Sequence, residues 1–427
     1  MLRRHQTTVL ALLLVGYASF YLCRANVDAA LPLLEQEGYD KTSLGKLSSI
    51  ATFTYATGKI LLGAAGDVLG GRRLMLIAIA GSVVCSLAIG AQHTLVFLIL
   101  FAAANRFFQS GGWSGLVQVV SQVFEPKRSG VVMGILSTSY ELGNVFALTL
   151  SAFVARRGWR ALFLVNPLLF ALVGGAVVLA LPRPDAGVRG EETPNERAPA
   201  LEEERAASFL TTLATLSRKG SFWTAVVLSA LLTFIRQGFL TWTPTYLYEV
   251  SRVSGHTEVT GAIVKSAMFP AAGVVAALAV GPIGDRLGRG KRAPIMAVSL
   301  SVLVGLVLFL AHGGVRDPFG AAAVIGGIGL FLLGPYSLLA GAIALDVSGK
   351  RGAATAAGII DGAGYFGATA SGFVLGSIAQ NRGWAAAFDV VAGAALLATA
   401  VSAGWSLVAL GRRPTKDPPA GSTSSAA

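Results

Sequence analysis

The sequence predicts an all-α polytopic membrane protein with twelve transmembrane helices in two pseudo-symmetric six-helix bundles. Two observations favour this fold: an apolar composition, and a set of landmarks that occurs twice in the same order. Of the 427 residues, 54% are hydrophobic and 13% charged, and the mean hydropathy is +0.65. This is more apolar than an ordinary soluble domain. Because backbone groups in lipid must bond internally, we expect the spans to be helices.

Twelve stretches are long and apolar enough to cross a hydrocarbon core of about 30 Å. They lie near residues 8–34, 44–66, 74–92, 94–121, 129–155, 160–181, 221–248, 259–283, 293–313, 318–346, 352–379 and 384–410.

The net charge of +12 indicates topology rather than a nucleic-acid partner. With the N-terminus inside, most of the 34 Lys and Arg residues fall on the inner side, among them Arg3, Lys127 and Arg286. This positive-inside bias predicts that both termini are cytoplasmic and that the protein lies in the cytoplasmic (inner) membrane. We expect a monomer in the lipid bilayer.

A polar segment divides the chain in two. The stretch "PRPDAGVRGEETPNERAPALEEERAAS" is rich in charge and proline, which is typical of a linker whose first half is disordered, and 200–217 is expected to form a surface helix. The predicted domains are an N-terminal bundle (1–181), a cytoplasmic linker (182–219), a C-terminal bundle (220–411) and a disordered tail (412–427).

The two halves repeat each other. Arg24 and Pro32 recur as Arg236 and Pro244 with the same separation. Four such pairs in the same order indicate an internal repeat. The other three pairs are "GAAGDVLGGRR" with "VGPIGDRLGRGKR", "EPKRSG" with "SGKRGA", and "RRGWRALF" with "NRGWAAAF".

Two six-helix halves related by an axis along the membrane normal resemble the major facilitator superfamily. The stretch "GAAGDVLGGRR" is similar to that superfamily's signature loop between helices 2 and 3. The resemblance implies that an acid and a basic pair hold the halves together on the cytoplasmic side in the outward-facing state. A membrane anchor with a capping Asp is the alternative. The residues at these positions are Asp67, Arg72 and Arg73, with Asp285 and Arg292 in the second copy.

Arg24 and Arg236 stand inside apolar spans, where a guanidinium costs at least about 2.5–3.5 kcal/mol. Matching positions of two related halves face each other across the space between them, so the two arginines are expected to converge. Two like charges favour a bound dianion, and phosphate suits the planar guanidinium fork. Tyr17 and Tyr21 lie on the same helix face as Arg24.

A local ion pair is the alternative explanation of Arg24. Asp28 follows it by one helical turn and could neutralise it. Arg236 has no acid within a turn on either side, so it argues more strongly for a ligand.

Several motifs narrow the resemblance to the organophosphate:phosphate antiporters, which include glycerol-3-phosphate and hexose-6-phosphate transporters. These motifs are "GYASFYLCRANV", "FIRQGFLTWTPTYLYEV", "FQSGGW", "ILSTSYELGN", "LLGPYSLL" and "GAATAAG". The resemblance implies that Arg24 and Arg236 bind phosphate and that Lys59 helps to hold the anion. The alternative for Lys59 is a snorkelling side chain.

Four positions depart from the pattern of that family. Ala25 replaces a lysine of the glycerol-phosphate members, Asp28 adds a charge, and Tyr140 takes the place of a histidine. Arg106 resembles the helix 4 signature of proton-coupled members of the wider superfamily. These departures concern the substrate and the coupling ion.

Glu141 and Asp361 are acids within spans. Either could carry a proton or bind sugar hydroxyls. Structural pairing with Lys265, Arg106 or Lys59 is the alternative.

The sequence therefore predicts a secondary transporter that exchanges an organic phosphate for inorganic phosphate by alternating access. Proton-coupled transport of another organic anion or drug is the second hypothesis, and a transporter-like sugar-phosphate sensor the third. We expect no enzyme activity and no cofactor, because no catalytic constellation appears, and no metal, because the four histidines are scattered without metal-ligand spacing. The predicted substrate residues are Arg24, Arg236, Lys59, Tyr17, Tyr21, Tyr140, Glu141 and Asp361, with Arg106 and Glu141 serving any proton coupling.

Overall fold

A computed structural model describes residues 4–181, 211, 213–255, 258–287, 292–339 and 343–411, and every regular element in these ranges is a helix. The predicted linker and tail fall almost entirely outside the described residues. Of the predicted surface helix at 200–217, only residues 211 and 213–217 are described, and they are helical.

The N-terminal half contains the first six predicted spans. The first span consists of α1 (Arg4–Ser19), the 3-10 helix η1 (Phe20–Cys23) and α2 (Ala25–Gln36). The others are α3 (Lys41–Leu69), α4 (Gly71–Gly90), α5 (Leu95–Val123), α6 (Pro126–Val154) and, after η2 (Ala155–Arg157), α7 (Trp159–Ala180).

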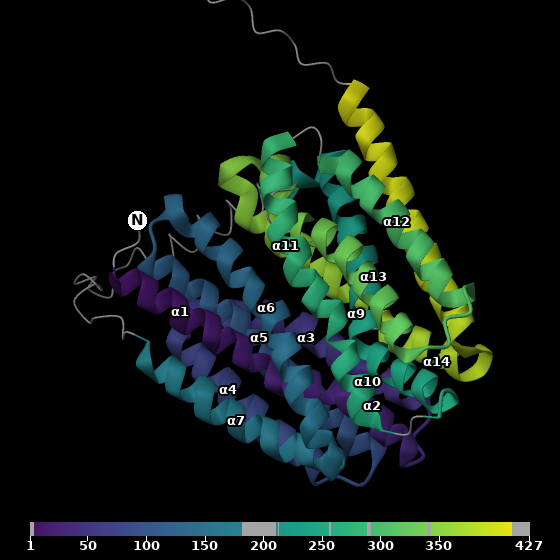
Figure 1. Ribbon diagram of the computed structural model, residues 1–427. Helices are drawn as coiled ribbons and strands as arrows, with labels where there is room; N and C mark the ends of the chain where they lie inside the picture. The colour runs from purple at the N-terminus through teal and green to yellow at the C-terminus, as the bar shows by residue number, and fades with distance from the viewer. Residues whose placement is uncertain are drawn as a thin grey trace, which may run out of the picture.

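The C-terminal half begins with α9 (Gly220–Val253) and ends with α14 (Ala344–Gly411). Gly383, with a φ of 82°, lies between the last two predicted spans. Glycine adopts this left-handed conformation without a steric penalty, and in Figure 1 the yellow end of α14 runs back beside α12. Between them come α10 (Val259–Ser266), α11 (Met268–Leu287), α12 (Arg292–His312) and α13 (Pro318–Leu338).

Nine helical segments of the described residues are long and apolar enough to cross a membrane. The last of these, Thr355–Leu407, includes two predicted spans. The predicted spans in α3 and α6 fall short of this criterion. Both helices carry polar side chains toward the centre of the molecule, such as Lys59 and Glu141, and these lower their mean hydropathy.

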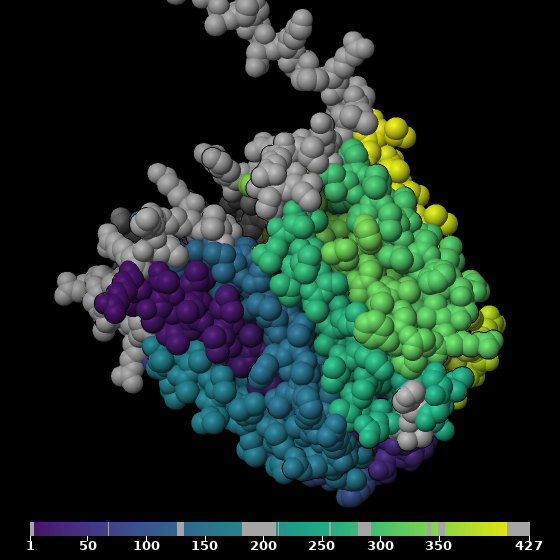
Figure 2. All heavy atoms as spheres, in the orientation of Figure 1, coloured from purple at the N-terminus to yellow at the C-terminus, as the bar shows by residue number. Residues whose placement is uncertain are grey.

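The two halves lie side by side in Figure 1, with the N-terminal half in purple and blue and the C-terminal half in green and yellow. The N-terminus and the C-terminal end of α14 lie at one end of the molecule, which we call the terminal end. The opposite end, which contains Lys41 and Gly383, is the distal end. In Figure 2 the blue and green atoms of the two halves meet over much of the visible face.

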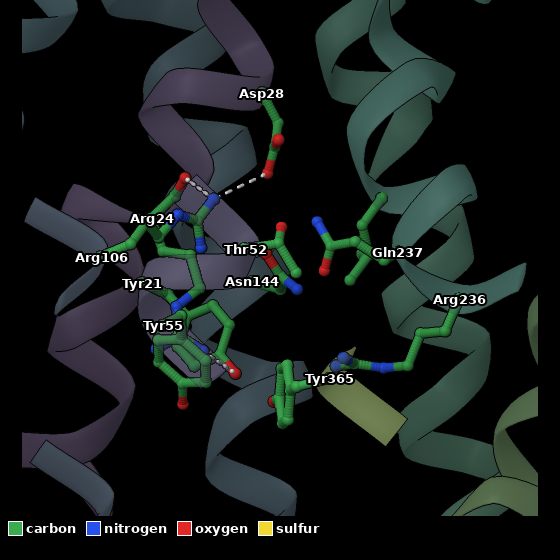
Figure 3. A pocket seen from close by; sticks show the side chains of 11 residues that line it. Tyr21, Arg24, Asp28, Thr52, Tyr55, Arg106, Asn144, Arg236, Gln237 and Tyr365 are labelled. Atoms are coloured by element: carbon green, nitrogen blue, oxygen red, sulfur yellow. Dashed lines mark hydrogen bonds and ion pairs between the residues drawn. The ribbon is translucent and has the colours of Figure 1, made fainter. Parts of the chain in front are cut away.

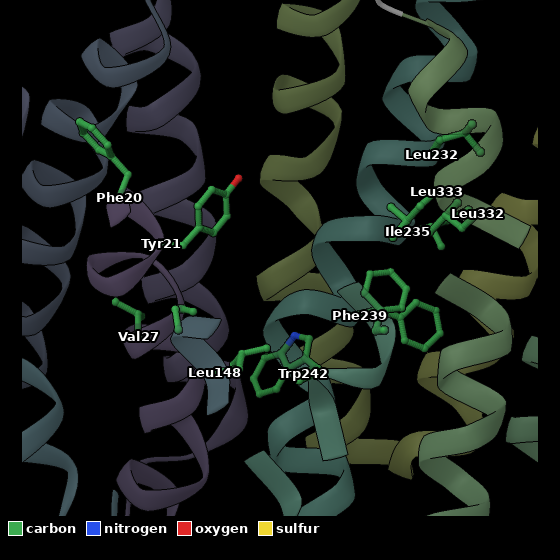
Figure 4. Close-up of a cluster of buried hydrophobic side chains, with 14 of the residues drawn as sticks. Phe20, Tyr21, Val27, Leu148, Leu232, Ile235, Phe239, Trp242, Leu332 and Leu333 are labelled. Carbon is green, nitrogen blue, oxygen red and sulfur yellow. The ribbon is translucent and has the colours of Figure 1, made fainter. Parts of the chain in front are cut away.

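Aromatic and aliphatic side chains of both halves form one packed interior (Figure 4). In the N-terminal half, Phe20 meets Phe170 edge-on with ring centroids 4.8 Å apart. In the C-terminal half, Phe239 stacks on Phe269 and Phe388 at 5.5 and 6.0 Å. Within a membrane such close packing, rather than hydrophobic exclusion from water, holds helices together.

At the distal end, α3 begins at a well-formed cap. The Asp40 carboxylate accepts hydrogen bonds from the backbone N–H and the hydroxyl of Ser43, both at 2.8 Å. These bonds hold the pKa of the Asp40 carboxyl below its usual range. The cap therefore orients the first turn of α3 next to the C-terminal half.

A cluster of charges joins the two halves at the distal end. Lys41 Nζ lies 2.7 Å from Glu35 Oε1 on its own half and 2.8 Å from Glu249 Oε1 on the other. The Trp384 indole donates to the second oxygen of Glu249 at 2.8 Å, and the Lys41 backbone N–H donates to Gln380 at 3.0 Å. We call these five residues the distal latch.

Replacing Lys41 with methionine is expected to weaken the contact that the distal latch makes between the two halves. The substitution leaves Glu35 and Glu249 without the cation between them, and the expected cost is about 1–2 kcal/mol, between the values for exposed and buried pairs. Spin labels at Glu37 and Arg382, which are both exposed, would report longer distances by double electron–electron resonance. Lys46→Met, at an exposed lysine of the same helix, is the control and should leave the distances unchanged. Equal distances in Lys41→Met and the wild type would refute the latch.

Candidate functional site

A polar cavity lies between the two halves, and the space between its walls, counted together with the solvent at its opening, is about 420 Å³. Figure 3 shows Arg24 and Arg236 entering it from opposite sides. The repeat in the sequence predicted this convergence. The lining residues are Tyr21, Arg24, Asp28, Thr52, Tyr55, Arg106, Asn144, Arg236, Gln237, Leu240 and Tyr365.

Arg24 stands at a break in the first spanning helix. After η1 its backbone N–H bonds to the Tyr21 carbonyl, and α2 starts at the next residue. Two carbonyls at the break are satisfied by side chains of α5: Gln109 donates to Cys23 O at 2.6 Å, and Arg106 donates to Arg24 O at 3.3 Å. A buried helix break needs such partners.

Gln109 also fixes the Arg24 side chain. Its carbonyl oxygen accepts from Arg24 Nε at 3.0 Å, while its amide nitrogen donates to Asn105 Oδ1 at 2.5 Å. Asn105 in turn donates to the Ser82 carbonyl of α4 at 2.8 Å. Gln109 and Asn105 are at most 1% exposed, so this buried amide chain holds Arg24 rigidly.

Arg24 has neutral partners among the described residues. Besides Gln109, it donates to the Tyr21 hydroxyl at 3.3 Å, and it lies over the rings of Tyr21 and Tyr55 at 4.8 and 4.5 Å. Its Nη2 is buried and has no hydrogen-bond partner among the described residues. This nitrogen is therefore available to a ligand in the cavity.

Asp28 does not pair with Arg24, although their spacing allows it. Its nearest basic partner is Arg106 of α5, with Nη2 at 3.7 Å from Asp28 Oδ2. The local ion pair considered from the sequence is thus replaced by a contact between two helices. The reason is that Gln109 and Tyr21 hold the Arg24 guanidinium away from the carboxylate.

Arg236 has an acidic partner that its own helix does not supply. Its Nη2 donates to Glu141 Oε1 of α6 at 3.0 Å, and its guanidinium lies near the rings of Tyr140 and Tyr336 at 5.6 and 5.1 Å. Arg236 Nε and Glu141 Oε2 are both buried without hydrogen-bond partners in the described part of the chain. The pair crosses between the two halves through one hydrogen bond.

Lys59 of α3 forms an ion pair with Asp361 of α14, and this pair also joins the two halves. The Lys59 ammonium lies 4.5 Å from the centre of the Tyr365 ring. The sequence offered Lys265, Arg106 or Lys59 as structural partners of the two intramembrane acids, and Asp361 pairs with Lys59. Glu141 pairs with Arg236, which was not among the partners considered.

The remaining predicted substrate residues, Tyr17 and Tyr140, are not part of the cavity lining. Tyr17 packs on Trp113 and Tyr21, with ring centroids 5.0 and 6.3 Å apart. The centre of the Tyr140 ring lies 5.6 Å from the Arg236 guanidinium carbon. Of the eight predicted residues, Arg24, Arg236 and Tyr21 line the cavity.

Sequence reasoning missed Gln109, Thr52, Tyr55 and Gln237. Thr52, Tyr55 and Lys59 are spaced three and four residues apart, so they occupy one face of α3. That pattern could have located the first two. Gln109 is a lone polar residue in an apolar span, and this is the only signal it gives.

The charges around the cavity leave one positive charge in excess. Among the residues that the structure describes, the four bases are Arg24, Lys59, Arg106 and Arg236, and the three acids are Asp28, Glu141 and Asp361. In a region of low dielectric this excess favours an anion.

Replacing Gln109 with leucine should reduce anion affinity, because Gln109 is a positioning residue for Arg24. The change leaves Cys23 O and Arg24 Nε without partners, which costs about 1–3 kcal/mol, or roughly a tenfold to hundredfold rise in KM for anion exchange. Gln109→Glu tests the role further. It keeps the acceptor but neutralises Arg24, so exchange should fall even where the purified protein stays folded. Gln92→Leu, at a half-buried glutamine near the end of α4, is the control. Unchanged KM in both Gln109 variants would refute the positioning role.

The fold agrees with comparisons to known proteins. Residues 13–372 match the family description "Major Facilitator Superfamily". The chain belongs to this superfamily. Its members are transporters rather than enzymes, and the predicted fold is confirmed.

Relatives with assigned names support the narrower resemblance as well. The chain is 29% identical to a probable hexose phosphate transport protein of Chlamydia trachomatis over 90% of this chain and 87% of that protein. It is 24% identical to the glycerol-3-phosphate transporter of Bacillus subtilis over 90% and 88%. Among solved structures, a bacterial homolog of the human lysosomal transporter Spinster, inward-facing and unoccupied, superposes with a TM-score of 0.77. It is 16% identical and covers 98% of this chain and 100% of that chain.

The superfamily's signature loops lie at the terminal end, and two side-chain contacts of the described residues there each stay within one half. Arg72 donates to the carbonyls of Val178 and Leu179 at 3.1 and 2.7 Å, at the end of α7. Arg292 pairs with Asp346 at 2.5 Å. Arg73 is exposed at the start of α4. The side chains of Asp67 and Asp285 lie outside the described residues, so their predicted gating role stays a prediction.

Proposed function

We propose that this protein exchanges an organic phosphate for inorganic phosphate across the cytoplasmic membrane by alternating access. The single observation that carries the proposal is the convergence of Arg24 and Arg236 from the two halves on one cavity, with an unpartnered nitrogen on each guanidinium. A phosphoryl group between them would accept from both forks. The names of the relatives support the same class of substrate.

Exchange follows from the way the halves are joined. The pairs Arg236–Glu141 and Lys59–Asp361 both cross between the halves. A bound dianion competes with the carboxylates for these bases, so the bridges weaken when the site is filled. A ligand shifts a conformational equilibrium only through such differential contacts. The positive-inside bias favours the terminal end as the cytoplasmic one.

The test is counterflow with purified protein in liposomes loaded with labelled inorganic phosphate. External inorganic phosphate, glycerol phosphate and hexose phosphate are added in turn, and each accepted substrate should release the label. Liposomes without protein control for leakage. Absence of release with every phosphate compound would refute the proposal.

A second candidate is proton-coupled transport of another organic anion. It is favoured by the Asp28–Arg106 pair on the cavity wall, because a buried carboxyl beside a base can take up and release a proton. Transport that requires a pH gradient, and that proceeds without a counter-anion, would support this candidate over the first.

A further inference from the structure

The cavity has two chemically distinct regions, and the second has no assigned ligand. In Figure 3, Arg236, Tyr55 and Tyr365 lie toward one side, while Asp28 and Arg106 lie toward the other. Asp28 comes one helical turn after Arg24, which is a rise of about 6 Å. A substrate held at the two arginines can therefore extend toward this second region.

The second region has unused hydrogen-bonding groups. Asn144 is 4% exposed, lines the cavity, and makes no side-chain hydrogen bond with another described residue. Arg106 Nε is buried without a partner in the described ranges. Buried polar groups in this state are expected to be satisfied by water or by a ligand.

Asp28 is the carboxylate that lines the cavity. Glu141 and Asp361, the acids first assigned to sugar hydroxyls, are bound by Arg236 and Lys59 and do not appear in the lining. Arg106 lies 3.7 Å from Asp28, which is longer than a direct hydrogen bond. A hydroxyl group on the cavity side of this pair can bridge the two side chains, because it donates to the carboxylate and accepts from the guanidinium.

We propose that Asp28, Arg106, Asn144 and Gln237 form a polyol subsite that binds the hydroxyl groups of a phosphorylated sugar. This inference rests on the proposed function, since the phosphoryl group must be held by Arg24 and Arg236. Gln237 donates to Thr241 at 3.0 Å through its amide nitrogen, which leaves its carbonyl oxygen to accept from a sugar hydroxyl. Amide and charged groups together offer both donors and acceptors, as a polyol requires.

The subsite predicts which substrate the protein prefers. A site built to bond hydroxyls discriminates strongly against compounds that lack them, because its polar groups are then left unpaired. Hexose phosphate should therefore be exchanged with a higher kcat/KM than inorganic phosphate or glycerol phosphate. The preference should depend on Asp28 and Asn144.

The test compares substrates in the full-length protein in liposomes. Counterflow against labelled inorganic phosphate is measured with external glucose 6-phosphate, glycerol 3-phosphate and inorganic phosphate for the wild type, Asp28→Asn and Asn144→Ala. The readout is the ratio of kcat/KM for glucose 6-phosphate to that for inorganic phosphate. This ratio should fall roughly tenfold in each variant, the effect of about one lost hydrogen bond. Asn381→Ala, at an exposed amide of α14, should keep the wild-type ratio.

The outcomes separate the subsite from the proposed function. Phosphate exchange with an unchanged ratio in both variants, or with no wild-type preference for the sugar phosphate, would overturn the subsite alone. Failure of the wild type to exchange any phosphate compound would overturn the proposed function and the subsite with it. Because the readout is a ratio within one preparation, partial loss of folded protein does not alter it, and Asn144→Ala still tests the subsite if Asp28→Asn does not fold.

Discussion

Replacing Arg24 with lysine is expected to lower kcat/KM for phosphate exchange at least roughly a hundredfold. Lysine keeps the positive charge but loses the planar fork that holds Gln109 and Tyr21 and leaves Nη2 for the ligand. Charge-assisted hydrogen bonds contribute about 1.5–3 kcal/mol each. Loss of two of them accounts for this factor.

Arg236→Lys should be less severe than Arg24→Lys. An ammonium at this position can keep the single hydrogen bond to Glu141, so the acid is not left unpaired, and only the ligand contact is lost. Counterflow of labelled phosphate measures both variants. Arg160→Lys, at an exposed arginine of α7, makes the same chemical change outside the cavity and should exchange normally. Wild-type kinetics in Arg24→Lys would remove Arg24 from the phosphate site.

The second large effect is expected from Gly45→Ala, near the distal end, where α3 packs against α14. A Cβ atom on Gly45 would lie 2.5 Å from the carbonyl oxygen of Gly372 and 3.0 Å from Phe373 Cα. These are backbone atoms of α14, which cannot rotate away, so α3 and α14 must separate. Overpacking of this kind costs about 1–3 kcal/mol or more.

In Gly45→Ala the close contact between α3 and α14 should be lost, and transport should be lost with it. The proposed alternating access requires this contact to form in every cycle. Exchange should therefore fall to the level of protein-free liposomes, and the distance between labels at Glu37 and Arg382 should increase. Gly305→Ala and Gly393→Ala are matched controls, because a Cβ at either position meets nothing within 4 Å. Both should remain active, since alanine is the better helix former. Normal exchange by Gly45→Ala would show that the close approach is not needed.

The proposed mechanism places opposing demands on the same side chains. The pairs Arg236–Glu141 and Lys59–Asp361 stabilise the contact between the halves, and the proposed substrate must loosen them. Breaking a buried pair by removing one partner is costly, whereas exchanging one anionic partner for another is much less so. This difference is the physical basis on which an empty site would stay locked and a filled one would move.

The sequence by itself determined the fold and the central pair of arginines. Stretches of apolar residues longer than a bilayer is thick can only be spanning helices, and landmarks repeated in order require two related halves. From that symmetry Arg24 and Arg236 had to face each other, and both line the same cavity. These conclusions depend on length, composition and order, which a sequence carries directly.

Only the tertiary structure decided the partners of each charge. Helical spacing placed Asp28 beside Arg24, but Gln109 holds Arg24 and leaves Asp28 to Arg106. Arg236 lacked a partner in its own helix and found Glu141, which precedes it by 95 residues. Periodicity describes the faces of a single helix. Which faces meet depends on how separate helices pack, and the strength of a buried charge pair changes steeply over the few ångströms that this packing sets.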